Sequence, residues 1–467
     1  MKKLLIIFNK FFTPFFNTRA AGVYMLLFAI AIAVATFVEN DFGTSAAQKI
    51  IFKSWWFELL LILFGISIVV NIIKFRMIPQ KKWPLLLFHS AIIIILIGAG
   101  ITRYFGYEGI MHIRENDTSN TFLSSNTFLN FKVLKDNKEY QFNEPVLFAS
   151  LGNNNWHRSY KIENDLIDIA VKEFIPNAKQ ILKKTSTGKP VLKIVIAGMN
   201  GREDYFIAQG QTKRIQNMVF NFTKNQLPDA INIDYKNDSL FFNADRMFTR
   251  MTMATRKNDT IFPSEAYSPL KLRSLYSDGS NRFVFGDFVK SGEVSIASEN
   301  RKMQTQSLAA LVLEVSVNGN TKETYVYGQE RVYGRPALLE YNDMNLSISY
   351  GAKNITLPFS IKLKKFIMDK YPGTNNASSY ASEVQLIDTQ KNISKDFRIY
   401  MNNILNYGGY RFFQSSFDRD EKGTYLSVNH DFWGTTISYL GYALLTLGML
   451  WTFFSKKTRF YQVTQKL

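Results

Sequence analysis

The sequence predicts a membrane protein with four transmembrane α-helices, three N-terminal and one C-terminal, and a large all-β extracytoplasmic domain. Four apolar runs are each close to the roughly 20 residues that a membrane-spanning helix needs. The long region between the third and the fourth run alternates apolar and polar residues, as half-buried strands do. Positive residues gather beside the apolar runs, where they set the orientation of membrane proteins.

The boundaries follow from where each apolar run begins and ends. A basic stretch precedes the first run, as in a signal peptide, but the run is longer than a signal-peptide core, so we expect it to stay as a helix. In chain order we expect a cytoplasmic or interfacial N-terminal segment (1–20), transmembrane helices (21–38, 55–73 and 84–101), a β-rich extracytoplasmic domain (102–432), a fourth transmembrane helix (433–454) and a basic cytoplasmic tail (455–467).

The net charge of +18 raises the question of nucleic-acid binding, and the positions of the positive residues answer it. Twelve of them lie in three segments without Asp or Glu, namely before the first run, between the second and third, and after the fourth. This is the positive-inside pattern. It predicts cytoplasmic termini, a domain on the opposite side of the membrane, and no nucleic-acid partner. The twelve are Lys2, Lys3, Lys10, Arg19, Lys74, Arg76, Lys81, Lys82, Lys456, Lys457, Arg459 and Lys466.

The region between the third and fourth runs has the features of an all-β domain. Segments such as FLNFKVL, DLIDIAV and LVLEVSV alternate in character, and the pairs Asn200–Gly201 and Asn318–Gly319 are typical of hairpin turns. A weak internal repeat is also present, in which a strand-like segment precedes a hairpin-like pair. Its three copies are residues 169–211, 284–330 and 361–402. We expect related β units in a sandwich or a barrel.

Signals for catalysis in this domain are few. The chain has no cysteine, so it performs no thiol chemistry, and it contains no HExxH, G-x-S-x-G or phosphate-binding glycine motif. His112 and His157 lie in polar surroundings, and we interpret them as solvated surface residues. His430 stands just before the fourth run, beside Trp433. We interpret it as part of an interfacial anchor, with a ligand role as the alternative.

His89 is different, because it lies inside the third apolar run, PLLLFHSAIIIILIGAG. An ionisable side chain within a membrane span is costly and is a hypothesis about function. His89 follows Pro84 by five residues, which is about 7–8 Å along a helix, so it belongs to the inner half of the membrane. Three roles remain open: a helix-to-helix hydrogen bond, for example with Asn71, a proton relay, and an axial ligand to haem iron. Glu58 lies near the outer end of its run, which leaves a relay without a second ionisable group at that depth.

Several stretches resemble the ResB/CcsB family of cytochrome c biogenesis proteins. AGVYMLLFAIAIAVATFVEN is similar to the first helix of the family, SWWFELLLILFGISIVVNI to the second and LLLFHSAIIIILIGAGITRYFGYEG to the third. PFSIKLKKFIMDKYPG and the stretch that begins ILNYGGYRFFQSSFDRDEKGTYLSVNHDFWG are the most specific matches. The resemblance implies the same plan of three spans, an exported β-rich domain and a final span.

The resemblance also implies a function. Proteins of this family act with a polytopic partner of the CcsA/ResC type to carry haem b to the outer face of the cytoplasmic (inner) membrane and attach it to apocytochrome c. The histidine of the third helix ligates haem in transit, a role that falls on His89. The tryptophan-rich segment of fused family members has no counterpart here, so the second axial ligand is expected from the partner. Whether the chain is non-catalytic or forms part of a haem-lyase complex stays open.

Two other functions compete with haem delivery. An efflux-type ABC permease also combines four spans with an exported domain, although its usual order is one span, the domain and then three spans. A membrane-anchored binding or scaffold protein, in which His89 only packs against a neighbouring helix, is the second alternative. Loss of a haem absorbance band on replacing His89 would support ligation.

Overall fold

The computed structural model describes residues 14–198, 201–264, 266–304, 307–341, 344–374 and 376–455. It confirms the predicted fold class: four helices are long and apolar enough to cross a membrane, and the rest of the described chain is rich in sheet. Most of the expected N-terminal segment, nearly all of the basic tail and the turn residue Asn200 lie outside the described residues. The chain divides into two compact units, Met1–Asn177 with Asn300–Leu467, and Ala178–Glu299.

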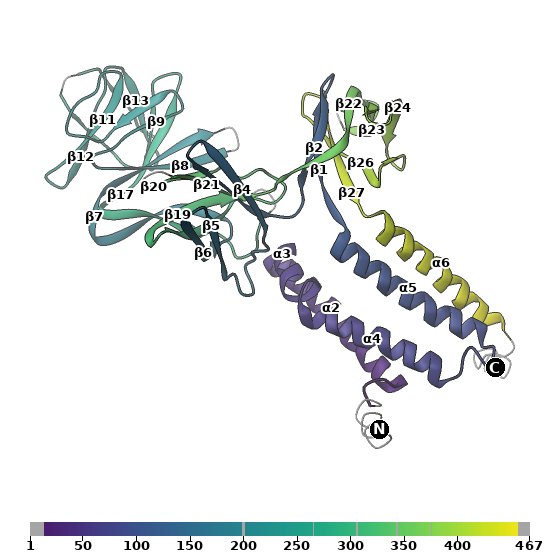
Figure 1. Cartoon of the computed structure of the whole chain (residues 1–467). Coiled ribbons are helices and arrows are strands. Elements are labelled where there is room, and N and C mark those ends of the chain that lie inside the picture. Colours follow the sequence, from purple (N-terminus) through teal and green to yellow (C-terminus); the bar gives the residue numbers. More distant parts are fainter. Residues whose placement is uncertain are drawn as a thin grey trace. The chain divides into compact units, whose positions relative to one another are not determined.

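The helices come from the N-terminal and C-terminal parts of the sequence of the first unit, where Figure 1 colours them purple to blue and yellow. Asn17 begins the first one, because its Oδ1 accepts a hydrogen bond of 2.9 Å from the backbone nitrogen of Ala20. A short helix and a single π-helical turn follow and lead into the next span. Proline in the first turn favours the start of the third span. The helices are α2 (Thr18–Phe42), α3 (Thr44–Ala47), η1 (Gln48–Phe52), α4 (Trp55–Lys74), α5 (Trp83–Phe105) and α6 (Phe432–Phe454).

An eight-stranded antiparallel sheet joins α5 to α6. β1 follows α5 after Gly106, β27 precedes α6, and Tyr107 of β1 pairs with His430 of β27, so the two helices leave from neighbouring strands. The sheet curls round one core, since the hydroxyl of Ser382 on one side of it donates a hydrogen bond to Gln414 (2.6 Å) and lies 2.9 Å from the hydroxyl oxygen of Thr424 on the other. Its order is β24 (Ile393–Tyr400), β23 (Ala377–Asp388), β22 (Asn354–Lys370), β2 (Thr118–Ser124), β1 (Tyr107–Arg114), β27 (Gly423–His430), β26 (Tyr410–Phe417) and β25 (Leu405–Tyr407).

A β-sandwich completes the first unit. Its two four-stranded sheets share one core cluster, which includes Phe131, Ile169, Leu313 and Ile348, so they pack face to face. One sheet is β19 (Asn320–Gly328), β18 (Ala309–Val317), β6 (Asp165–Ile175) and β5 (Trp156–Ile162). The other is β20 (Ala337–Tyr341), β21 (Met344–Gly351), β3 (Phe128–Lys135) and β4 (Lys138–Pro145).

The second unit is a sandwich with its own core. Aromatic residues dominate this core, for example Phe220, Phe242 and Phe283. Its six-stranded sheet is β14 (Asn258–Ile261), β13 (Phe248–Thr252), β16 (Ser274–Ser277), β17 (Arg282–Ser298), β7 (Ala178–Gly198) and β8 (Gly201–Ala208). Its five-stranded sheet is β15 (Ser268–Pro269), β12 (Ser239–Asn243), β11 (Ala230–Lys236), β10 (Met218–Asn221) and β9 (Thr212–Ile215).

The three copies of the sequence repeat each fold as a strand followed by a hairpin. These are β6 with β7–β8, β17 with β18–β19, and β22 with β23–β24. Only in the third copy does the strand pair with its own hairpin. In the first two copies the partners are exchanged, because β6 pairs with β18 and β17 pairs with β7. The exchange places the hairpin of the first copy in the second unit.

Candidate functional site

Helices α5 and α6 form the closest contact among the membrane-spanning helices, along a seam of glycines (Figure 1). The glycines of α6 recur every seven residues, at Gly434, Gly441 and Gly448, and all three are buried. A Cβ added to Gly441 would lie 2.6 Å from Ile95, and one added to Gly448 would lie 2.8 Å from the backbone nitrogen of Phe88. Small residues at such positions let two membrane helices approach closely. This seam holds the part of α5 that carries His89.

His89 is half-buried and hydrogen-bonds within its own helix. Its Nδ1 lies 2.7 Å from the carbonyl oxygen of Leu85, one turn earlier. A carbonyl only accepts hydrogen bonds, so Nδ1 carries the proton and Nε2 keeps its lone pair. Among the described residues, Nε2 has no hydrogen-bond partner. The hydrogen bond therefore holds the neutral ring in the tautomer in which Nε2 can bind a metal.

An apolar groove between α4 and α5 begins one turn beyond His89. It has a volume of about 430 Å³, and Ile93, Leu96 and Gly100 of α5 line one wall. These residues follow His89 by four, seven and eleven positions, so they share its helix face. On the α4 wall, a Cβ added to Gly65 would lie 3.3 Å from Leu96, which shows that the glycine helps to keep the groove open. The helix face that carries His89 thus continues into this groove.

The other polar groups of these helices bond elsewhere. Asn71 does not contact His89, because its Oδ1 accepts a hydrogen bond of 3.0 Å from Thr18 of α2. Glu58 lies at the far end of the groove, where it forms an ion pair with Arg103 and accepts a hydrogen bond from Tyr104. Within the described residues, no group of three or more His, Cys, Asp and Glu side chains could hold a metal ion. Among the described residues, His89 would therefore bind a metal without a cluster of further ligands beside it.

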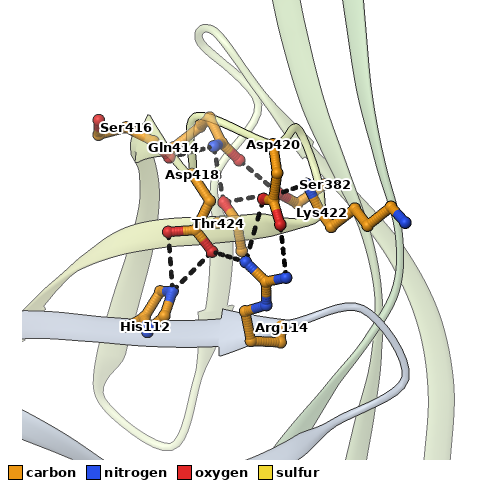
Figure 2. Close-up of polar contacts among 9 residues, drawn as sticks. All are labelled: His112, Arg114, Ser382, Gln414, Ser416, Asp418, Asp420, Lys422 and Thr424. Atoms are coloured by element: carbon orange, nitrogen blue, oxygen red, sulfur yellow. Dashed lines mark hydrogen bonds and ion pairs between the residues drawn. The ribbon is translucent and has the colours of Figure 1, made fainter. Parts of the chain in front are cut away.

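His112 is an exposed surface residue, as its polar surroundings in sequence indicate, but it takes part in a cluster of polar contacts. Its ring stacks on Tyr425 with 4.4 Å between centroids, and its Nε2 lies 2.9 Å from Oδ2 of Asp418 (Figure 2). Arg114 binds the same carboxylate at 2.7 Å and Asp420 at 2.7 Å. Burial alone would raise the pKa of Asp418, but hydrogen bonds from His112 and Arg114 outweigh it and lower the pKa. The cluster ties β1 to the turn between β26 and β27.

The two remaining histidines differ in setting. His157 is an exposed surface residue, 3.7 Å from a carboxylate oxygen of Asp168. The ring of His430 lies between two tyrosines, with centroids 4.6 Å from Tyr107 and 4.4 Å from Tyr410. The two hydroxyl groups of these tyrosines are 2.8 Å apart. This aromatic cluster lies at the end of the sheet next to α6, where an anchor at the membrane surface is expected.

Comparison with known proteins shows that the parts of the chain around His89 are similar to a known protein family. The sequence model of the ResB-like family matches residues 80–162 and 337–430. These two segments are therefore similar to the ResB-like family. They contain α5 with His89, strands β1 to β5 and the strands from β20 to β27. The resemblance found in the sequence is thereby confirmed.

A curated relative extends the similarity over nearly the whole chain. Protein NrfI of Wolinella succinogenes is 28% identical over 435 residues, which is 93% of this chain. The chain spans 34% of the length of that relative. The similarity therefore includes the second unit, which lies between the two segments matched by the family model.

The glycine seam and the groove were not predicted from the sequence, although the glycine spacing that forms one side of the seam is visible in it. The spacing of seven residues between Gly434, Gly441 and Gly448 is visible in the sequence and indicates one helix face. The partner of that face was not readable, because α5 lies more than 300 residues earlier in the chain. The pairing of Asp418 with His112 is hidden for the same reason.

Proposed function

We propose that this ResB-like chain acts in cytochrome c biogenesis, where it carries haem b to the outer face of the inner membrane together with a CcsA/ResC-type membrane partner. The match of two segments to the ResB-like family is the observation that carries the proposal. It favours this function over an ABC permease or a membrane-anchored scaffold. Apocytochrome c would receive the haem. The orientation rests on the basic segments, which put both termini in the cytoplasm and the β units outside.

In this proposal His89 is an axial ligand to the haem iron. The Nδ1 hydrogen bond to Leu85 leaves Nε2 as the only nitrogen that can bind iron, and it fixes the plane of the ring. The apolar groove on the same helix face suits the macrocycle, which is soluble among apolar side chains. If His89 only joined two helices by a hydrogen bond, Nε2 would be expected to have a hydrogen-bond partner on a neighbouring helix.

The charged propionates need a different environment. Lys82 precedes His89 by seven residues, which is about 10 Å along the helix axis at the cytoplasmic end of α5. This length suits the distance from a haem iron to its propionate groups. Lys81 is exposed and Lys82 half-buried, so both ammonium groups can reach an anion at the membrane surface. We propose that these lysines orient the haem with its propionates toward the cytoplasm.

The second axial ligand comes from the partner. Since the described residues offer no second histidine, cysteine or carboxylate cluster near His89, one chain leaves the other face of the iron open. Haem would therefore bind at the contact between the two proteins, and neither protein alone would retain it firmly. This requirement couples haem uptake to assembly of the complex.

The test compares haem bound to the complex of this chain and its partner. Membranes containing both proteins are solubilised, the complex is purified, and its haem absorbance is divided by the protein absorbance. His89→Ala should abolish the band, whereas His157→Ala, which removes an exposed histidine, should leave it unchanged. An unchanged band in His89→Ala, with normal assembly of the complex, would rule out ligation by His89.

A further inference from the structure

A hollow of about 460 Å³ lies where the turn between β25 and β26 meets the start of α6. Tyr407 and Arg411 line it from the sheet, and Phe432, Thr435, Thr436 and Tyr439 line it from the helix. The turn is formed by Gly408 and Gly409, which both have positive φ values of 59° and 84°. A Cβ added to Gly408 would lie 3.2 Å from the ring of Phe359, and one added to Gly409 would lie 3.2 Å from the ring of His430, so the tight turn favours glycine at both positions. Nothing in the proposed haem pathway uses this site.

Arg411 carries a positive charge that no carboxylate of the described residues balances by an ion pair. Its Nη2 donates hydrogen bonds to Oδ1 of Asn429 (2.8 Å) and Oγ1 of Thr435 (2.7 Å). Its Nε is buried and has no hydrogen-bond partner among the described residues. Such a donor loses its water on folding without gaining a partner, which costs free energy. Nη1 has no hydrogen-bond partner among the described residues either, and it is not fully buried, so a ligand with acceptor oxygens in the hollow can reach it.

The nearest carboxylate is already engaged. Asp431 accepts hydrogen bonds on Oδ2 from Thr102 (2.7 Å) and Thr435 (3.2 Å), so it reaches Arg411 only through the threonine hydroxyl. Asp431 also makes no side-chain hydrogen bond to the backbone at the start of α6. The first N–H groups of a helix of 23 residues therefore add their positive partial charge to the guanidinium.

The surroundings place this hollow at a membrane surface. Trp433 and Tyr439 are 67% and 65% exposed, and Phe432 is 51% exposed, all within the first eight residues of α6. Exposed aromatic residues at the end of a spanning helix lie at the level of the lipid headgroups. An anion at this level that also has an apolar part would fit both the arginine and the aromatic wall.

We propose that this hollow binds the phosphate group of a membrane phospholipid, with Arg411 as its main donor. Nη1 of the guanidinium supplies charge-assisted hydrogen bonds to the phosphate oxygens, while Nη2 keeps its bonds to Asn429 and Thr435. The acyl chains would follow the apolar surface of α6. A bound lipid would thereby join the eight-stranded sheet to the outer end of the α5–α6 pair. The proposal is independent of the role of His89.

The experiment measures lipid bound to the purified full chain by native mass spectrometry in detergent. Phosphatidylglycerol is titrated, with diacylglycerol of the same acyl chains and inorganic phosphate as separate probes. We expect phosphatidylglycerol to bind at least about tenfold more tightly than diacylglycerol, and inorganic phosphate not to compete at millimolar concentration. Equal binding of the two lipids, or full competition by inorganic phosphate, would overturn the proposal.

Three variants distinguish the site from general lipid adhesion. Arg411→Gln should weaken phosphatidylglycerol binding at least about tenfold, and Arg398→Gln, which changes an exposed arginine of the same sheet, should not. Thr436→Phe fills the hollow while leaving both hydrogen bonds of Arg411 in place, so it should also abolish binding. Thr436→Phe therefore decides the matter if Arg411→Gln does not fold. Unchanged binding in a folded Thr436→Phe protein would contradict the assignment.

Discussion

Gly448 of α6 lies directly against Phe88 of α5, the residue before His89: a Cβ on this glycine would lie 2.8 Å from the backbone nitrogen of Phe88. The obstacle is backbone, which cannot move aside as the end of a flexible side chain can. The position of His89 is therefore coupled to the size of one residue on the last helix. This relationship links the first segment of the ResB-like match, which contains Phe88, to the final span, which follows the second segment.

Gly448→Ala should separate the two helices at the level of His89. Overpacking of a tight contact costs about 1–3 kcal/mol. Thermal unfolding of the purified protein in detergent should therefore occur at a lower temperature, and the haem absorbance of the complex should fall. Gly22→Ala is the matched control, because a Cβ on Gly22 in α2 meets nothing within 4 Å. That variant should be neutral or slightly more stable, since alanine favours helix. Equal effects of the two changes would contradict the seam.

The cluster around Asp418 predicts a dependence of stability on pH. Burial raises the pKa of Asp418, but hydrogen bonds from His112 and Arg114 lower it further than burial raises it, so the net shift is below the ordinary 3.8. The ionised form is thus favoured in the folded protein. Its contribution to stability is present above about pH 4 and is lost as the pH falls through the lower folded value.

Asp418→Asn tests this contribution. At pH 7 the variant should be less stable by about 1–3 kcal/mol, because Arg114 and His112 lose a charged acceptor. The difference from the wild-type protein should shrink as the pH is lowered below 4, measured by thermal unfolding. Asp396→Asn is the control, since Asp396 is 68% exposed and its pair with Lys364 is a surface ion pair. Such pairs contribute about 0–1 kcal/mol. A constant difference at all pH values would contradict the linkage.

The helices and strands could be predicted from the sequence, but the pairing of the strands could not. Long apolar runs identify spanning helices by themselves, and the turn at Asn318–Gly319 forms as its residue types predict, with both φ values positive. Alternation of apolar and polar residues identifies a strand, but it does not specify the strand beside it. The exchange of partners between β6, β7, β17 and β18 was therefore hidden, although the repeat itself was readable.

The same limit applies to the candidate site. His89 was found because a histidine is rare in an apolar run, and its hydrogen bond to Leu85 is local, at a spacing of four residues. Its proposed partner Asn71 was wrong, because that choice required knowing which helix faces which. The groove and the Arg411 hollow each combine residues from segments that are distant or differ in type. No periodicity in a single segment carries such information.

Asn177 closes the junction at which the chain leaves the first unit. It is 4% exposed and has a positive φ of 47°, a conformation that asparagine tolerates. Its Nδ2 donates to the carbonyl oxygens of Asn300 and Lys302, and its Oδ1 accepts from the backbone nitrogen of Gln304 at 2.9 Å. Asn177→Ala should destabilise the protein by about 1–3 kcal/mol, because three backbone groups lose their partner. Chemical unfolding measures the loss, and an unchanged midpoint would contradict this role.

Removal of residues 178–299 should leave the first unit folded. Ala178 and Ser298 are paired across β7 and β17, so the ends of the excised segment are about 5 Å apart and a linker of two glycines can replace it. The buried residues of the second unit's core lie between Leu192 and Phe285, and none of the three core clusters of the first unit includes any of them. The shortened chain should therefore keep its circular dichroism signal, resist limited proteolysis and unfold cooperatively.

The separate segment Ala178–Glu299 should fold as well, because its sandwich has a complete core of its own. If the shortened chain assembled with the partner and still bound haem, the second unit would be dispensable for haem binding, whereas aggregation of both fragments would show that the two units depend on each other for folding.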